Sequence, residues 1–491
     1  MTLLLNKEGI LPLKRGGLQV AVMGPNAKDS VMMWGNYNGM PARTVTVLEG
    51  IQSALGKDDK LIYEQGCPWV GETLLESVFS KCRSEKGPGF TAQYWNNVNH
   101  EGVADIENQV LTPFNFCTSG ATVFAPGVNL TDFSATYRSC YTPEVSGEIV
   151  FDLYSFGKGR LLVNGKELLS FYNSHGGNRQ SCSMVVEKGK QYNITLDFEY
   201  LQSDAQLNFD MGFKKEVNIA ESVAAVKDAD VVIFVGGISP SLEGEEMGVD
   251  LPGFRKGDRL DIELPEVQRK LLAALHEAGK KVILVNCSGS PIGLLPETVT
   301  CDAILQAWYP GQQGGTAVAE VLFGDYNPAG RLPVTFYRNV NQLPDFEDYN
   351  MTGRTYRFMT DKPLFPFGYG LSYTTFRYGT IQLDKTSVSG GDVLRVTVPV
   401  SNIGNRDGEE VVQLYLSKVD DEQGPVKTLR SFKRVNIPKG QTVNVQFELS
   451  DKELEWWDNR SNTMKLSSGT YRLGVGGSSD VEMYSSFTVL E

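Results

Sequence analysis

Three glutamates stand close together on one predicted loop, and their carboxyl groups are suited to acid–base chemistry. Glu243, Glu245 and Glu246 lie in the stretch GGISPSLEGEEMGVDLPGFRKGDRLDIELP, which follows an apolar run. A carboxyl group that donates a proton near neutral pH needs a raised pKa, which closure against another domain can provide. Three glutamates within four residues are also typical of a solvated acidic loop, so composition alone singles out none of them.

Several apolar runs alternate with helical patterns on either side of this loop. Strands are predicted at 18–27, 61–66, 231–237, 281–290 and 301–311, and helices at 46–55, 219–230 and 264–281. Fully apolar strands that alternate with helices predict an open, mostly parallel α/β sheet covered on both faces. Ligands of such sheets bind at the carboxyl ends of the strands, and the glutamate loop begins at one of these ends.

Two other parts of the chain predict β structure alone. Between 87 and 214 the helical period gives way to short alternating segments, and Asn164-Gly165 between two of them is a strong hairpin signal. The last part alternates in the same way and predicts an immunoglobulin-like sandwich. The expected domains are an α/β sandwich in two parts (1–86 and 215–345), an inserted β-sandwich (87–214), a strap (346–375) and a C-terminal β-sandwich (376–491).

Composition excludes several classes of function. The chain has 491 residues and a net charge of −13, with basic residues dispersed, which disfavours nucleic acid binding. No stretch approaches the roughly 20 apolar residues of a membrane span. The seven cysteines are scattered and the three histidines lie far apart, so we expect no disulfide scaffold, no metal site and no cofactor.

Ordered strings along the whole chain resemble the C-terminal portion of a glycoside hydrolase family 3 enzyme. They are LLLNKEGILPLK (3–14), VAVMGPNA (20–27), ADVVIFVGG (229–237), the loop SLEGEE…GDR…ELP (241–265), YPGQQGGTAVAEVLFGDYNPAGRLPVTF (309–336) and PFGYGLSYTTF (366–376). The inserted β part resembles the protective-antigen-type module of some members. The last part resembles the family's fibronectin type III-like domain.

The resemblance implies roles for particular residues. Ser-Leu-Glu at 241–243 matches the family's Ser-x-Glu element, which favours Glu243 as the general acid/base, with Glu245 and Glu246 as alternatives. Asp258-Arg259 matches an Asp-Arg pair after that residue, and Arg259 could bind substrate or form a structural ion pair. The family's N-terminal barrel, which supplies the aspartate nucleophile, does not match any part of this sequence.

Residues Trp34, Asn36 and Tyr37 form a second candidate group. An aromatic ring and an amide suit stacking on a sugar face and recognition of its hydroxyl groups. Packing of the two rings against a further domain is an equally good interpretation of this string.

The expected function follows from the resemblance. The chain is expected to be part of a retaining exo-β-glycosidase that removes terminal xylose or glucose from oligosaccharides, with a barrel domain or polypeptide as partner. The alternative is a non-catalytic carbohydrate-binding or structural fragment, because one carboxylate cannot carry out a double displacement. Family resemblance also leads us to expect a periplasmic or secreted location.

Overall fold

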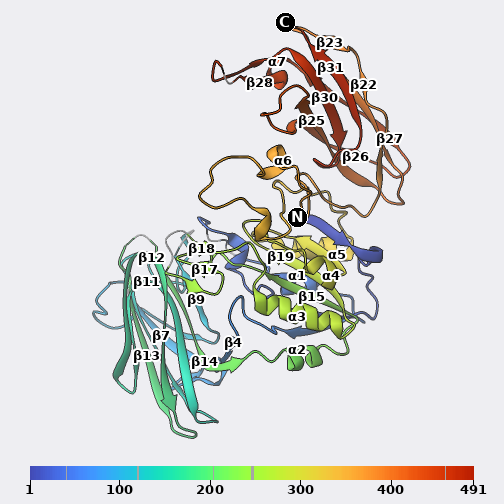
Figure 1. The fold of residues 1–491 in the computed structure, drawn as a ribbon. Coiled ribbons are helices and arrows are strands. Elements are labelled where there is room, and N and C mark those ends of the chain that lie inside the picture. The colour runs from blue at the N-terminus through green and yellow to red at the C-terminus, as the bar shows by residue number, and fades with distance from the viewer. Residues whose placement is uncertain are drawn as a thin grey trace.

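The computed structural model describes residues 1–39, 41, 43–118, 121–202, 204–244, 248–458 and 460–490, and of residues 175 and 176 the backbone alone. Figure 1 shows an α/β region in the middle of the molecule, a β-rich segment (cyan to green) on one side of it and a C-terminal β domain (red) on another. Glu245 and Glu246 lie outside the described residues.

A six-stranded sheet forms the centre of the α/β region. All neighbouring strands are parallel except the edge pair β1–β20, so the predicted mostly parallel sheet is confirmed. In spatial order the strands are β1 (Thr2–Asn6), β20 (Ala303–Gln306), β19 (Lys281–Cys287), β15 (Val231–Gly237), β2 (Gln19–Met23) and β3 (Lys60–Glu64).

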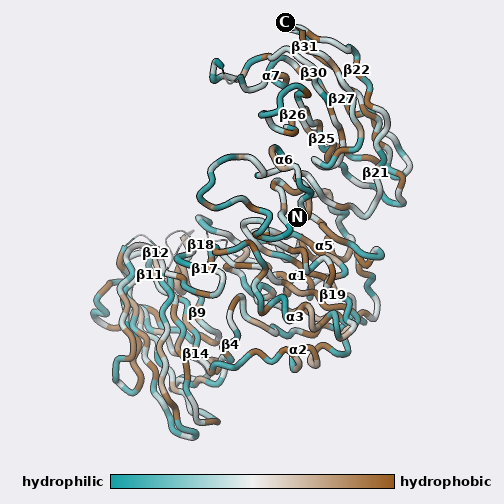
Figure 2. The backbone as a smooth tube through the Cα atoms, in the orientation of Figure 1, coloured by the Kyte–Doolittle hydropathy of each residue, from teal (hydrophilic) through white to brown (hydrophobic). Residues whose placement is uncertain are grey.

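Apolar side chains of the central strand β15 alternate between two cores, one on each face of the sheet. Ile233 packs in the core beneath α1 (Val47–Ala54) and α5 (Gly314–Phe323). Phe234 packs in the opposite core beneath α3 (Glu266–Glu277). Burial on both faces explains why the sequence of this strand is apolar throughout rather than alternating. Figure 2 shows the hydrophobic stretches in the interior of this region and hydrophilic ones in many peripheral loops.

Helices α1 and α5 cross with their backbones in contact, and glycines make this possible. A Cβ atom on Gly50 would lie 2.0 Å from the carbonyl oxygen of Gly315, and one on Gly315 would lie 2.0 Å from the carbonyl oxygen of Thr46. The glycine pair that follows TyrProGly in the sequence therefore serves close backbone packing. The remaining helices are α2 (Ile219–Ala225), α4 (Glu297–Thr300), α6 (Thr355–Phe358) and α7 (Asp451–Leu454).

The β-rich segment contains an eleven-stranded sheet whose centre is a long hairpin. Its turn is the predicted Asn164-Gly165, since Val163 pairs with Lys166 and both turn residues have positive φ, 50° and 77°. Phe90, Tyr94 and Tyr137 are fully buried in its aromatic core. The strands are β4 (Thr73–Ser77), β5 (Arg83–Ser84), β6 (Gly87–Pro88), β7 (Phe90–Trp95), β8 (Ile106–Val110), β9 (Phe114–Cys117), β10 (Ser134–Tyr141), β11 (Gly147–Val163), β12 (Lys166–Val186), β13 (Tyr192–Glu199) and β14 (Gln206–Glu216).

The C-terminal domain packs two sheets over one apolar core, as the alternating sequence predicts. Side chains of β24 and β25, such as Val398 and Leu414, meet in this core. One sheet contains β21 (Phe376–Tyr378), β24 (Leu394–Asn402), β22 (Gln382–Leu383) and β27 (Thr442–Leu449). The other contains β23 (Ser387–Val388), β31 (Tyr484–Val489), β30 (Gly469–Gly476), β25 (Gly408–Lys418) and β26 (Thr428–Ile437), and a separate ribbon pairs β28 (Glu455–Asp458) with β29 (Thr463–Leu466).

A buried ion pair joins this domain to the chain that precedes it. Arg331 donates from Nη2 to Oε2 of Glu410 over 2.6 Å, and the two side chains are 9% and 4% exposed. The hydroxyl of Tyr378 donates to the other carboxylate oxygen over 2.9 Å. Because removal of one partner would leave a buried charge uncompensated, this pair favours one placement of the domain.

The described part of the chain shows neither a membrane-spanning helix nor a metal-binding cluster. No described helix combines the length and the apolar character needed to cross a membrane. The described residues also contain no group of three or more His, Cys, Asp or Glu side chains placed to hold a metal ion. Among the described residues, the thiols of Cys67, Cys82, Cys140, Cys182, Cys287 and Cys301 form no disulfide.

We expect Gly315→Ala to destabilise the α/β region by about 1–3 kcal/mol, as overpacking of a close contact does. The added methyl group would meet the Thr46 backbone, which cannot move aside as a side-chain tip can. This steric cost should exceed the gain of up to about 1 kcal/mol that alanine brings to a helix. Urea unfolding measures the change, with Glu320→Ala, an exposed position on α5, as the control. Equal stability of the two variants would contradict the backbone contact.

Candidate active site

The glutamate loop begins at Gly237, the last residue of β15. Gly237 has φ of 112°, and a Cβ atom there would lie 2.0 Å from the carbonyl oxygen of Cys287 on the neighbouring strand. Only glycine meets both conditions, because other residues disfavour this φ and would clash with the strand. The chain can thus leave the sheet beside β19 without breaking strand pairing.

Two buried amide side chains hold the start of this loop. Gln268 on α3 accepts a hydrogen bond from the Gly237 N–H and donates one to its carbonyl oxygen, both over 2.8 Å. Asn26, which follows β2, donates to the carbonyl oxygens of Gly236 and Ile238 over 3.1 and 3.2 Å. Because both amides are 0% exposed, water does not compete for these hydrogen bonds.

Glu243 is half-buried, and its carboxylate reaches the segments that follow β19 and β20, the next two strands of the sheet. Oε1 accepts a hydrogen bond of 3.2 Å from the Gly289 N–H and a second, short one from the hydroxyl of Tyr309. Gly289 follows β19 and Tyr309 follows β20. The site therefore forms where three adjacent strands end on the same edge of the sheet, as the rule for parallel α/β sheets predicts.

Tyr309 is the residue of this site that sequence reasoning missed. Burial, and secondarily the nearby negative charge of Glu243, raise the pKa of its phenol well above the usual range. Tyr309 is therefore a neutral hydrogen-bond donor at physiological pH. Tyr309 stands in the string YPGQQGG, and a hydroxyl at the end of β20, two strands from β15 in the sheet, was the signal available.

Arg259 lies next to this cluster on β18 (Asp258–Arg259), in a small sheet with β16 (Asp250–Leu251) and β17 (Phe254–Arg255). Its Nη1 donates to Ser290 Oγ over 2.8 Å and to the Pro291 carbonyl oxygen over 3.0 Å. Its Nη2 is buried and has no hydrogen-bond partner among the described residues.

Burial and neighbouring carboxylates act on the pKa of the Arg259 guanidinium. Burial lowers the pKa of the guanidinium, and the negative charges of Glu243 and Asp261 act in the opposite direction. Nη2 is thus a cationic donor beside Glu243 that is available to a further group.

Of the three other predicted site residues, Asn36 forms a hydrogen bond with Glu243. Asn36 donates to the backbone carbonyl oxygen of Glu243 over 3.1 Å, so it holds the loop. Trp34 is partly buried, and its indole N–H donates to Thr44 over 2.8 Å. Tyr37 is 90% exposed, with φ of 52°.

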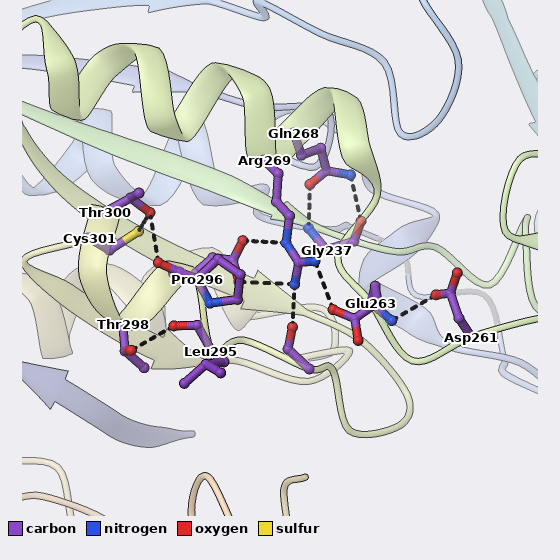
Figure 3. Close-up of polar contacts among 12 residues, drawn as sticks. Gly237, Asp261, Glu263, Gln268, Arg269, Leu295, Pro296, Thr298, Thr300 and Cys301 are labelled. Atoms are coloured by element: carbon purple, nitrogen blue, oxygen red, sulfur yellow. Dashed lines mark hydrogen bonds and ion pairs between the residues drawn. The ribbon is translucent and has the colours of Figure 1, made fainter. Parts of the chain in front are cut away.

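A second polar network, in which Glu297 is buried and Arg269 and Glu263 are partly buried, supports the loop that carries Arg259 (Figure 3). Arg269 on α3 contacts Glu263 over 2.7 Å and Glu297 over 2.8 Å, and it also donates to the carbonyl oxygen of Gly293. Glu297 is 1% exposed. Arg269 thereby joins Glu263, four residues after Arg259, to the segment after β19 that contains Gly289.

Comparison with known proteins places this chain in a family. A model of the glycosyl hydrolase family 3 C-terminal domain matches residues 1–373, and a model of a fibronectin type III-like domain matches residues 410–479. The first match covers more than half of the chain, which therefore belongs to glycosyl hydrolase family 3.

Its relatives are longer than this chain. A xylan 1,4-beta-xylosidase from Xylanibacter ruminicola is 45% identical over 98% of this chain and 55% of its own length. A beta-glucosidase from Rhizobium radiobacter is 31% identical over 97% of this chain and 59% of its own length. The crystal structure of a beta-glucosidase from Kluyveromyces marxianus matches the fold with a TM-score of 0.74 at 24% identity, over 100% of this chain and 61% of that one. The chain thus spans little more than half the length of these relatives.

We expect Gln268→Ala to destabilise the protein by about 2 kcal/mol or more, because buried backbone groups left without a partner each cost about 1–3 kcal/mol. It should also speed hydrogen exchange at the Gly237 amide. Urea unfolding and exchange rates measure the two effects. Lys270→Ala is the control on the same helix, since its surface ion pairs with Glu72 and Glu266 contribute below about 1 kcal/mol. An unchanged hydrogen-exchange rate at the Gly237 amide would contradict the proposed role of the Gln268 side chain.

Proposed function

We propose that this chain carries the general acid/base, Glu243, of a retaining exo-β-glycosidase that acts on terminal β-linked xylose or glucose. The observation that carries the proposal is the half-buried Glu243 carboxylate, hydrogen-bonded to Gly289 and Tyr309 at the carboxyl edge of the sheet. The names of its relatives, xylan 1,4-beta-xylosidase and beta-glucosidase, support this substrate class. The higher identity to the xylosidase favours xylose.

The proposed reaction divides between two domains. In the first half, the Glu243 carboxyl protonates the glycosidic oxygen while the C1–O bond breaks, and a carboxylate of a barrel domain outside residues 1–491 bonds to C1. In the second half, the Glu243 carboxylate takes a proton from water as the water oxygen bonds to C1 and releases the barrel carboxylate. Both halves need Glu243 within hydrogen-bonding reach of the reacting oxygen.

Exposed aromatic side chains on two segments are candidates for contact with a further domain. Tyr37, Phe346 and Tyr349 are 90%, 91% and 89% exposed. The loop that carries Phe346 and Tyr349 is held by Arg354, which donates to the carbonyl oxygens of Asp345, Asp348 and Asn350. A loop shaped by its own hydrogen bonds that presents aromatic rings to water is typical of a contact surface.

We expect the chain alone to show negligible hydrolysis of aryl β-xylosides and β-glucosides, because double displacement needs a nucleophile in addition to Glu243. Product release assayed with purified residues 1–491 measures this. The alternative, a non-catalytic carbohydrate-binding fragment, also predicts no turnover here and differs in the next experiment. Substantial turnover by the chain alone would contradict a separate nucleophile domain.

Joining the chain to the part of the Xylanibacter ruminicola relative that it does not cover should restore hydrolysis. In this chimera, Glu243→Ala should lower kcat/KM for a phenyl β-xyloside by about 10²–10⁴-fold, the usual range for lost acid–base catalysis. Azide should partly restore turnover of an activated substrate and form a glycosyl azide. Glu266→Ala, an exposed carboxylate on α3, is the matched control. If Glu243→Ala has no effect while the chimera is active, the role belongs to Glu245 or Glu246.

A further inference from the structure

The two oxygens of the Glu243 carboxylate differ in their surroundings. Oε1 accepts both hydrogen bonds, from the Gly289 N–H over 3.2 Å and from the Tyr309 hydroxyl. Oε2 has no hydrogen-bond partner among the described residues. A carboxyl group held by one oxygen presents the other in a fixed direction, so the two oxygens have separate tasks.

We infer that Tyr309 is a positioning residue that holds Glu243 Oε1 so that Oε2 is the oxygen that donates and accepts the proton. The inference rests on the proposed acid/base function of Glu243. Tyr309 itself contacts Glu243 and not the reacting atoms, so it acts through the carboxylate.

The ring of Tyr309 is held in place by close backbone contacts. A Cβ atom on Gly289 would lie 3.0 Å from the Tyr309 ring and 3.0 Å from Glu243 Oε1, so glycine leaves room for both side chains. A Cβ atom on Gly35 would lie 3.5 Å from the same ring. The Gly311 N–H donates to the Met33 carbonyl oxygen over 2.7 Å and fixes the chain beyond the ring. The Tyr309 side chain therefore loses little conformational entropy when its hydroxyl binds the carboxylate.

The charged groups around Glu243 make this restraint necessary. Arg259 contributes a favourable charge to the same cluster, and its buried Nη2 lacks a partner among the described residues. Without the Tyr309 hydroxyl, the carboxylate could turn toward Nη2 and form an ion pair there. The proton-carrying oxygen would then leave its place, and a displacement of about 1 Å can cost about 10²-fold in rate.

The test compares substrates that need the proton with substrates that do not. In the active chimera, Tyr309→Phe keeps the ring and removes the hydroxyl. We expect kcat/KM for a phenyl β-xyloside, whose leaving group needs protonation, to fall about 10–100-fold. For a 2,4-dinitrophenyl β-xyloside, which leaves without protonation, it should change less than about threefold, because acid assistance contributes little there.

The matched control is Tyr373→Phe. Tyr373 is also partly buried against the same core, and its hydroxyl donates to the Val321 carbonyl oxygen over 2.6 Å, away from Glu243. Both variants should unfold at similar urea concentrations. Only Tyr309→Phe should lower kcat/KM for the phenyl β-xyloside more than for the 2,4-dinitrophenyl β-xyloside.

Three outcomes decide the matter. If Tyr309→Phe lowers kcat/KM equally for both substrates, or for neither, Tyr309 does not position Glu243. A loss of activity in Glu243→Ala would still support the proposed function in that case. An inactive wild-type chimera, or an active one indifferent to Glu243→Ala, overturns the proposed function and this inference with it. Loss confined to the phenyl substrate in both Glu243→Ala and Tyr309→Phe supports the inference.

Discussion

The hydrogen bonds between Gln268 and Gly237 are the constraint on which the candidate site depends. They satisfy both backbone groups of the last residue in β15 and tie them to α3, where Arg269 stands next in sequence. The same turn of helix thus fixes the start of the Glu243 loop and, through Glu263 and Glu297, the segments that supply Arg259 and Gly289. One rigid helix therefore sets the relative position of elements that come from distant parts of the sequence.

Local patterns made most of the fold predictable. The apolar run at 231–237 is a strand because every side chain in it is buried on one face or the other. Asn164-Gly165 is a hairpin turn because its positive φ angles suit asparagine and glycine. These features depend on neighbouring residues, so a single sequence contains the information. The position of the Glu243 loop followed from the same reasoning, since it begins where a parallel strand ends.

The partners of Glu243 could not be predicted, because they depend on contacts between distant residues. Tyr309 stands 66 residues from Glu243 and Asn36 stands 207 residues away, and no periodicity relates them. The order of strands in the sheet decides which loops meet, and that order is a global property of the fold. Arg259 was expected either to form a structural ion pair or to bind substrate. Its hydrogen bonds go to Ser290 and a backbone carbonyl, one nitrogen is without a partner among the described residues, and its substrate-binding role stays a prediction.

Buried polar side chains lie at this edge of the sheet. Their burial costs desolvation free energy, and their hydrogen bonds fix the geometry of the strand ends. Asn286 at the end of β19 donates to Gln306 at the end of β20 over 2.6 Å, and Gln306 donates to Ser288 over 3.0 Å; all three side chains are 0% exposed. Apolar residues would stabilise a sheet edge more simply, since buried polar groups must first lose their water. What they add is direction, because each hydrogen bond fixes an angle as well as a distance. For the proposed acid/base role of Glu243, with a nucleophile on another domain, alignment must come from the domain that carries the carboxylate. The amides at the strand ends, Tyr309 and the Arg269 network hold the segments around that carboxylate.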